Sequence, residues 1–239
     1  MRDALRESLD LLLPTHCVVC AEPAHRLCPD CDARLCTALR SPLRVEETAL
    51  SLPLLTAGEP LPVLAGGLYA PPVSTALLSF KDHQGVYLRR RLAAGLHRAV
   101  CAALSLPGVH GDPGPPPVLV PVPGSLSGYL RRGYDPVDAL LDARGDWPVA
   151  TIRAVAGARV DPGALLRPAT SHAGQSSSAR RRTRRRWRVR RTLAPGTPVI
   201  LIDDVVTTGA TLAAAVRWVR RAGGAPVAAA VVAGVAPAG

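Results

Sequence analysis

The sequence predicts an α/β protein in which helices flank a parallel β-sheet, with a small zinc-binding cysteine module at the N-terminal end. Two apolar runs, at 118–122 and 199–202, are typical of strands buried on both faces of such a sheet. Each run precedes small or hydroxylated residues and then a helical pattern. Five of the six cysteines lie within 20 residues near the N-terminus, which predicts a separate metal-binding unit. At 239 residues, the chain has room for one ordinary α/β domain and such an appendage.

The composition supports a hydrophobic core and a cytoplasmic protein. Hydrophobic residues make up 48% of the chain, but no apolar run reaches the roughly 18 residues that a membrane span needs. Acidic residues interrupt residues 1–14, and no cleavage site follows, so this segment lacks the layout of a secretory signal. We therefore expect a cytoplasmic location and no membrane span.

The net charge of +11 comes mainly from one short run. Nine arginines lie between Arg180 and Arg191, which leaves +2 for the rest of the chain. Such a run is typical of a flexible basic arm that binds nucleic acid, although its one aromatic residue, Trp187, offers little base stacking.

The first 62 residues are expected to contain a helix, the cysteine module and a linker. Leucines recur at helical spacing between residues 5 and 12, which predicts a short amphipathic helix over 1–13. Prolines and a glycine recur between 41 and 62, which predicts an irregular segment. The expected organisation is a helix and cysteine module at 1–45, a linker at 46–62 and a main domain at 63–239.

The main domain is expected to alternate strands and helices. Apolar residues with helical spacing predict a long helix over 85–104, and Gly223–Gly224 is a typical end for a helix over 210–222. In chain order, the expected elements are a strand at 63–69, helices at 71–80 and 85–104, a strand at 118–122, a helix at 136–144, one or two weak strands within 149–166, a strand at 199–202, a helix at 210–222 and a strand at 226–232.

Two Cys-x2-Cys pairs, Cys17 with Cys20 and Cys28 with Cys31, predict a structural zinc site. Four thiolates satisfy a tetrahedral Zn²⁺ ion, and each short pair lets backbone N–H groups face the sulfurs. Disulfide pairing is the first alternative and is disfavoured because a signal peptide is absent. A redox pair is the second, and it lacks the expected βαβ context.

The remaining cysteines and nearby histidines are assigned lesser roles. His16 or His25 could replace one cysteine ligand, although each is more typical of a surface residue. Cys36 and Cys101 are expected to pack as small hydrophobic residues.

The stretch from Val199 to Thr211 combines a buried strand, two acids and a hydroxyl-rich turn before a helix. Ligands of open α/β sheets bind outside the carboxyl ends of the strands, where Asp203 and Asp204 are expected. The following helix N-terminus offers N–H groups and a positive dipole end to an anion. The hydroxyls and the phosphate of a sugar phosphate are separated by a distance similar to that expected between the two acids and the helix N-terminus. The alternatives are a strand end that caps a helix, and an aspartate pair that binds magnesium in an unrelated phosphotransferase.

A second candidate loop follows the strand at 118–122. Residues 123–128 are rich in glycine and serine, and Arg131 and Arg132 come next. This pattern suits an anion, and a simple surface turn is the alternative.

The stretch from Ile200 to Thr211 resembles the phosphoribosyl pyrophosphate (PRPP) signature of type I phosphoribosyltransferases. In that family, adjacent acids bind the ribose 2′- and 3′-hydroxyls, and the loop that follows binds the 5′-phosphate. The resemblance implies that Asp203 and Asp204 hold the ribose at the catalytic site and that PRPP binds with Mg²⁺. It also implies that the 5′-phosphate is held by Thr207, Thr208, Gly209, Ala210 and Thr211.

The order of features along the chain resembles one branch of these proteins, the ComF family, which is linked to natural competence. The shared features, over residues 5–233, are an N-terminal helix, a cysteine zinc module, a helix ending in Lys81, Val-Pro-Val-Pro at 120–123, Arg-Gly-aromatic at 132–134 and an arginine-rich stretch after Gln175. Family members usually continue as RGFNQ, whereas this chain has Arg-Gly-Tyr-Asp-Pro at 132–136.

The resemblance implies phosphoribosyl transfer, in which a nucleophile displaces pyrophosphate from C1 of the ribose. Lys81, Ser125 and Arg132 are the candidates to stabilise the leaving pyrophosphate. Residues 167–191 would form a loop that closes over the site, which is the alternative to a nucleic-acid arm. The acceptor is not visible in the sequence. The alternative function is a non-catalytic module that senses PRPP or binds single-stranded DNA alongside other DNA-uptake proteins.

Overall fold

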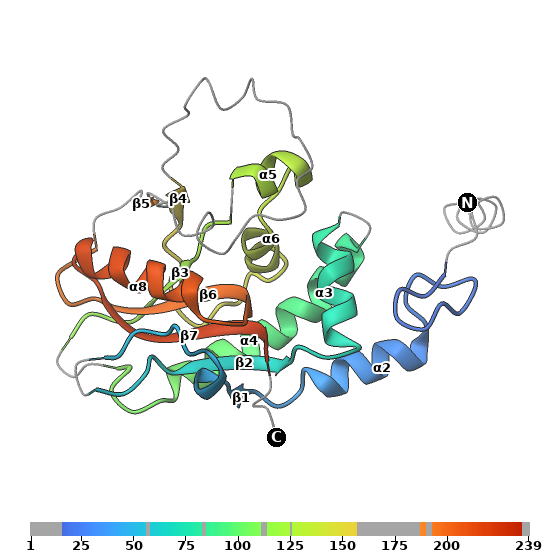
Figure 1. Cartoon of the computed structure of the whole chain (residues 1–239), viewed down its shortest axis with the longest axis horizontal. Helices are drawn as coiled ribbons and strands as arrows, with labels where there is room; N and C mark the ends of the chain where they lie inside the picture. Colours follow the sequence, from blue (N-terminus) through green and yellow to red (C-terminus); the bar gives the residue numbers. More distant parts are fainter. Residues whose placement is uncertain are drawn as a thin grey trace.

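A computed structural model describes residues 16–55, 58–82, 85–110, 114–124, 126–156, 187–189 and 193–235. Its centre is a five-stranded sheet in the order β1-β2-β7-β6-β3 (Figure 1). All pairings are parallel except that of β1 with β2. The strands are β1 (Leu43–Arg44), β2 (Val63–Leu68), β3 (Val118–Pro121), β6 (Pro198–Val206) and β7 (Ala225–Gly234). The predicted α/β fold with a parallel sheet is confirmed.

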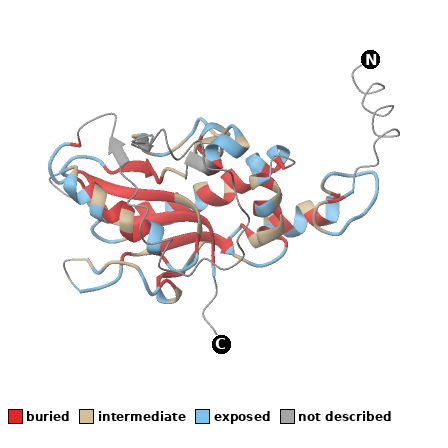
Figure 2. Ribbon diagram, turned by 45° about the horizontal axis from the view of Figure 1, so that its top comes forward, coloured by how far each residue is buried: buried red, intermediate tan, exposed pale blue. Residues whose placement is uncertain are grey.

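Helices cover both faces of the sheet, and the alternation of side chains along β6 explains why. Ile200 and Ile202 pack with one set of helices, whereas Val199 and Leu201 pack on the other face. All four side chains are fully buried, and the strands lie between layers of helix (Figure 2). The first face carries α3 (Val73–Lys81), α4 (Arg89–Leu104) and α6 (Pro136–Asp142), and the second carries α8 (Ala210–Arg221).

Strand β6 is longer than the predicted strand at 199–202. It continues through both aspartates to Val206, because Asp203 and Val205 remain paired with β7 at Val231 and Ala233. The acids therefore lie within the last half of the strand and not after it. Their side chains still reach the carboxyl edge of the sheet, where β6 gives way to the turn before α8.

Two helices occur where no helix was predicted. Helix α2 (Pro29–Ala38) begins with proline at its first position and has Asp30 and Asp32 in its first turn, both favourable at a helix N-terminus. Helix α5 (Leu126–Arg132) replaces much of the predicted loop at 123–128. Gly133 ends α5 in the left-handed conformation, at φ +74°, and its N–H donates to Tyr129 O (2.6 Å).

The segment at 46–62, predicted to be an irregular linker, packs against the sheet. It contains the 3₁₀ turn η1 (Glu46–Thr48), and Ala49 and Leu61 are buried in the core on the α8 face. The carboxylate of Glu46 is also buried, and it is paired with Arg44 and accepts the Val63 N–H (3.3 Å).

The remaining predicted elements are found with shifted ends or lie outside the described residues. A 3₁₀ turn, η2 (Val86–Leu88), precedes α4, and β4 (Ala154–Ala156) is the one strand described within 149–166. It pairs antiparallel with β5 (Trp187–Val189), inside the arginine run. The helix predicted at 1–13 and the rest of the loop at 167–191 lie outside the described residues. Among the described helices, none is long and apolar enough to span a membrane.

Candidate functional site

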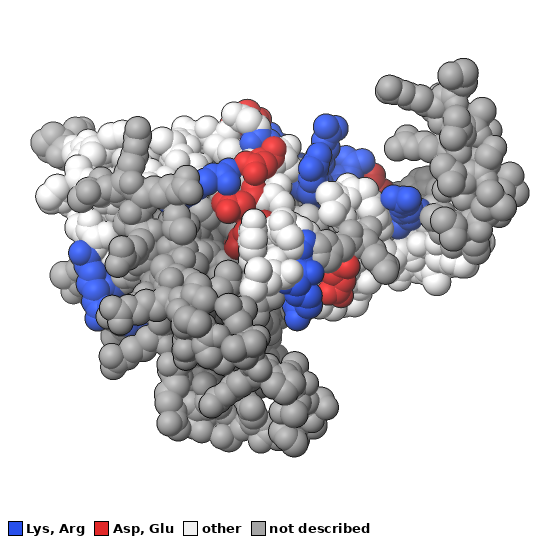
Figure 3. All heavy atoms as spheres, turned by 90° about the horizontal axis from the view of Figure 1, so that it is seen from above, with Lys and Arg blue, Asp and Glu red and all other residues white. Residues whose placement is uncertain are grey.

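A pocket of about 210 Å³ opens where β3 and β6 end at the carboxyl edge of the sheet. The Val122 N–H donates to Ile202 O (2.8 Å), which brings the turn after β3 beside the aspartates. Acidic and basic side chains lie next to one another near the middle of this view of the molecule (Figure 3). The pocket is lined by Lys81, Val122, Pro123, Gly124, Arg132, Asp135, Pro136, Val137, Asp203, Asp204, Val205 and Thr211.

Asp203 and Asp204 share this pocket with one lysine. Lys81 Nζ lies 2.9 Å from Asp204 Oδ2, and the Asp204 N–H donates to Asp203 Oδ1 at 2.9 Å. Burial, followed by the negative charge of Asp204, raises the pKa of Asp203 to about 8. Ionisation of Asp203 is therefore disfavoured in the free protein, and Lys81 pairs with the neighbouring Asp204.

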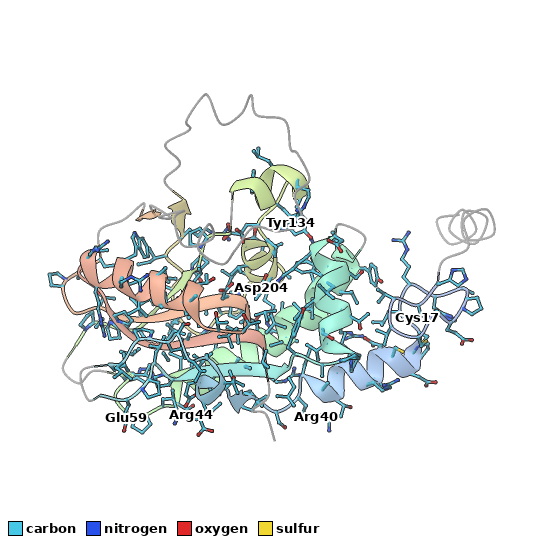
Figure 4. All side chains as sticks on the ribbon, viewed as in Figure 1. Cys17, Arg40, Arg44, Glu59, Tyr134 and Asp204 are labelled. Carbon is cyan, nitrogen blue, oxygen red and sulfur yellow. The ribbon has the colours of Figure 1, made fainter. Side chains whose placement is uncertain are left out.

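Lys81 is positioned by the aromatic residue of the Arg-Gly-Tyr segment. Tyr134 donates a hydrogen bond from its hydroxyl to the carbonyl of Phe80, and the two rings pack with centroids 5.8 Å apart. Burial raises the pKa of Tyr134, so the hydroxyl remains a donor at neutral pH. Tyr134 lies near α6 and α3 in Figure 4, where Asp204 is also labelled. The last turn of α3 is thereby tied to the segment before α6.

Asp135 organises the turn after β3, a role that the sequence did not indicate. Its carboxylate accepts hydrogen bonds from the N–H of Gly124 (2.8 Å) and from the N–H of Val137 (2.9 Å). The same side chain therefore caps the N-terminus of α6 and holds the turn after β3. A Cβ on Gly124 would lie 2.7 Å from Asp135 Oδ2, so a larger residue there would displace this carboxylate from the turn. The proline after Asp135, at the first position of α6, was the available signal for this cap.

Two of the three residues that were predicted to bind pyrophosphate lie at the pocket. Lys81 and Arg132 line the same pocket, from α3 and α5. Arg132 Nε is buried and has no hydrogen-bond partner among the described residues, so a donor is available inside the protein. Ser125 lies outside the described residues.

The predicted phosphate loop joins β6 to α8. Thr207, Thr208, Ala210 and Thr211 are exposed, and Gly209 is buried at the N-cap of α8 with φ +79°. Thr208 Oγ1 accepts the Ala210 N–H at 3.4 Å. The first turn of an α-helix leaves N–H groups without partners inside the helix, and these groups favour an anion. Thr211 also lines the pocket, so the loop and the aspartates face one site.

Replacing Asp203 with asparagine is expected to stabilise the free protein, increasingly so as pH rises. Asparagine keeps an oxygen for the Asp204 N–H but never ionises. The unfolded aspartate ionises near pH 4, whereas the folded one holds its proton to about pH 8, so wild-type stability falls across this window. Thermal melts at pH 4 and pH 8 measure the effect. We expect nearly equal Tm values at pH 4 and an increase on the order of 10 °C for Asp203→Asn at pH 8. A Tm difference that does not change with pH would contradict the raised pKa.

The four cysteines of the predicted zinc site come together. The sulfurs of Cys17, Cys20, Cys28 and Cys31 all lie within 4.8 Å of one another, and Cys20 Sγ is 3.6 Å from Cys28 Sγ. Zinc–sulfur bonds of about 2.3 Å in a tetrahedron place the sulfurs about 3.8 Å apart, so the cluster fits Zn²⁺. All four are free thiols, not disulfides.

The electrostatics of the cluster also suit a cation. Burial raises the pKa of Cys17, but the N–H groups of Cys28, Cys20 and Val19 lower it by more, to about 6. Burial and then the neighbouring sulfurs raise the pKa of Cys31 to about 12. Four such thiols cannot all ionise together unless a cation compensates their charges, and Zn²⁺ would do so.

The other cysteines and the two histidines stay outside the cluster. His16 and His25 are exposed, and Cys36 is partly buried on α2. Cys101 is exposed on α4, near His97, so its predicted packing as a small hydrophobic residue is wrong. Position along the helix, not the apolar composition of α4, decides which side faces the core.

The module is attached to the main domain by polar contacts and by α2. Arg91 binds both carboxylate oxygens of Asp32 (2.7 and 2.6 Å), and Tyr87 donates to Arg26 O (2.8 Å). The cluster lies at one end of the molecule, far from Asp204 (Figure 4). The four sulfurs therefore do not take part in the pocket.

The comparison with protein families agrees with this geometry. The family model described as phosphoribosyl transferase domain matches residues 167–237, the range that contains β6, the predicted phosphate loop, α8 and β7. No curated protein matches the sequence. The chain thus has a phosphoribosyltransferase-like α/β fold with an N-terminal cysteine cluster, and its aspartate pair and predicted phosphate loop lie inside the part that is similar to phosphoribosyl transferase domains.

Proposed function

We propose that the protein binds PRPP with Mg²⁺ and transfers its phosphoribosyl group to an acceptor, as a member of the ComF branch. The observation that carries this proposal is the pocket in which the aspartate pair on β6, Thr211 of the following loop and two basic side chains meet. A ligand with vicinal hydroxyls between two anionic groups has the complementary chemistry. PRPP is such a ligand.

Each part of the ligand is assigned to one part of the site. Asp203 and Asp204 accept hydrogen bonds from the ribose 2′- and 3′-hydroxyls, an arrangement in which the charge strengthens each bond. The loop from Thr207 to Thr211, including Thr208, Gly209 and Ala210, binds the 5′-phosphate through N–H and hydroxyl donors. Lys81 and Arg132 face the pyrophosphate, and Ser125 is assigned to the same end by its place in the chain.

Transfer breaks the bond between C1 of the ribose and the pyrophosphate oxygen, and the acceptor nucleophile forms the new bond at C1. Negative charge grows on the departing oxygen, where positive side chains placed in advance lower the barrier. Mg²⁺, for which carboxylate and phosphate oxygens are suitable ligands, would supply further positive charge at the pyrophosphate.

Lys81 has a second role in this proposal. In the free protein its ammonium group pairs with the carboxylate of Asp204 at 2.9 Å; both side chains are partly buried, and each compensates the charge of the other. When the ribose hydroxyls occupy Asp204, the ammonium group is released toward the pyrophosphate. The ribose hydroxyls donate hydrogen bonds, and these favour the ionised form of Asp203. Because the pKa of Asp203 is raised, we expect PRPP binding to strengthen with pH up to about 8.

The branch assignment combines the PRPP-like site with the cysteine cluster, which we propose holds a structural zinc ion. A role in DNA uptake follows from this assignment. The competing function is a module that senses PRPP, or binds single-stranded DNA through the run at 180–191, without catalysis.

Pyrophosphate release tests the enzymatic proposal. The full chain with PRPP, Mg²⁺ and a panel of nucleobase acceptors should release pyrophosphate only when the right acceptor is present. Lys81→Gln should lower kcat/KM by about 10²-fold, since it removes one charge from the leaving group. Arg153→Gln, a change to an exposed arginine that pairs with Asp138 and Asp142, is the matched control and should leave the rate unchanged. PRPP binding without release by any acceptor would favour the sensing module.

A further inference from the structure

The loop assigned to the 5′-phosphate rests on a segment far from it in sequence. The Ser51 N–H donates to the carbonyl of Thr208 at 2.8 Å. A Cβ placed on Gly209 would lie 2.8 Å from Leu52 Cγ and 3.2 Å from the Ala49 side chain. One face of the loop is therefore covered by residues 49–52, which belong to the predicted linker.

We propose that residues 49–52 are a positioning element for phosphate binding and that Leu52 is its principal side chain. This inference rests on the proposed function, since it concerns the affinity of that same loop for the 5′-phosphate. Leu52 acts through the loop backbone and has no contact with the ligand in this assignment.

The geometry of one peptide unit explains how the element acts. In a planar trans peptide, the carbonyl of one residue and the N–H of the next point in opposite directions. The Thr208 carbonyl points toward Ser51, so the Gly209 N–H points away from residues 49–52. The loop residues on either side of Gly209 in the chain, Thr208 and Ala210, are exposed. The hydrogen bond from Ser51 therefore directs an N–H donor toward the face where an anion can approach.

Leu52 holds the same peptide from the side. Gly209 has φ +79°, a conformation open to glycine, and its missing Cβ lets Leu52 approach the backbone. Leu52 is partly buried against the α8-face core, whereas Leu50, two residues earlier, is 93% exposed. Two leucines in one segment thus differ in whether they touch the loop.

The supporting segment is itself anchored to the sheet. Thr48 Oγ1 donates to Val45 O (2.9 Å) or to Val235 O (3.0 Å), just after β7. The Leu52 N–H donates to Ala49 O at 2.8 Å, and Ala49 is buried in the core. A support fixed to the end of β7 can hold the loop in its binding conformation before the ligand arrives, which lowers the cost of binding.

The test compares Leu52→Ala with Leu50→Ala and uses two ligands that separate the ends of the site. Ribose 5-phosphate engages the phosphate loop, whereas magnesium pyrophosphate engages the Lys81 end. Calorimetry should show that Leu52→Ala lowers the affinity for ribose 5-phosphate by about 3- to 30-fold, because the binding-competent conformation of the loop is less populated. Its affinity for magnesium pyrophosphate should stay unchanged. Leu50→Ala should match wild type for both ligands.

Leu52→Val is the second variant, in case the alanine variant does not fold. Valine lacks the Cδ2 carbon that faces Gly209. This variant should therefore lose less affinity for ribose 5-phosphate than the alanine variant, and its affinity for magnesium pyrophosphate should stay unchanged. Equal ribose 5-phosphate affinity in wild type and in the folded Leu52 variants would overturn the inference and leave the proposed function intact. Equal losses for both ligands would also overturn it, because the role would then be general stability. If wild type binds neither ligand, the proposed function fails and the inference with it.

Discussion

Replacing Cys17 and Cys28 together with serine is expected to abolish zinc binding and to unfold the cysteine module. Residues 16–28 have little core of their own: the sulfurs form a separate small cluster, with Val19 and Leu27 packed against it. Metal binding therefore supplies most of the folding free energy of this segment, and structural zinc in finger peptides contributes about 10–16 kcal/mol. Metal analysis should find about one zinc per wild-type chain and none in the double variant.

The matched control is the pair Cys36→Ser and Cys101→Ser, which changes two cysteines outside the cluster. This variant should keep its zinc and its Tm. Hydrogen exchange should show loss of protection in the module of the cluster variant, while the sheet stays protected. Equal zinc content in all three proteins, or none in carefully prepared wild type, would contradict a four-cysteine site.

The central strands of the sheet could be predicted because a strand that is buried on both faces consists of consecutive apolar residues. The run at 199–202 is apolar on both faces, and the structure buries both faces. Its true end at Val206 could not be predicted, because pairing with β7 carries Asp203 and Val205 beyond the apolar run. Register with a distant strand is a tertiary property that a local pattern does not contain.

Helices α2 and α5 were not predicted, because their local sequence signals are masked or weak. Helix α2 has clear signals, with proline at its start and acids in its first turn, but the cysteine spacing masks its short apolar face. Helix α5 contains Gly128 and is seven residues long, so its propensity is weak. Gly133 and the cap at Asp135 fix its end and the start of α6.

The aspartate pair and the loop after it could be predicted from residues contiguous in the chain, whereas a pyrophosphate-binding role for Lys81 and Arg132, which also line the pocket, was predicted only through the family resemblance. Asp203, Asp204 and the loop that follows are adjacent, so their shared role is visible as a motif. The Lys81–Asp204 ion pair, the Asp135 turn and the support from residues 49–52 each join distant segments. The segment at 46–62 looked like a linker because prolines signal irregular backbone, yet irregular backbone can still pack and support a loop.

The combination of Asp203→Asn and Asp204→Asn is expected to remove PRPP binding while the protein stays folded. Both side chains line the pocket and only partly enter the core. Each loss of a charged hydrogen-bond partner costs about 1.5–3 kcal/mol, so the two together should weaken PRPP by about 10²-fold or more. Asp30→Asn, which changes an exposed acid on α2, is the matched control and should bind PRPP like wild type.

Calorimetric titration of the wild type and the double variant with PRPP and Mg²⁺, at pH 8, tests the central claim most directly. The PRPP assignment predicts saturable binding to wild type, no measurable binding to the folded double variant, and a ligand-induced rise in Tm for wild type alone. If wild type fails to bind at millimolar PRPP, or the double variant binds equally well, the assignment is contradicted and the aspartate pair is only the polar end of a buried strand.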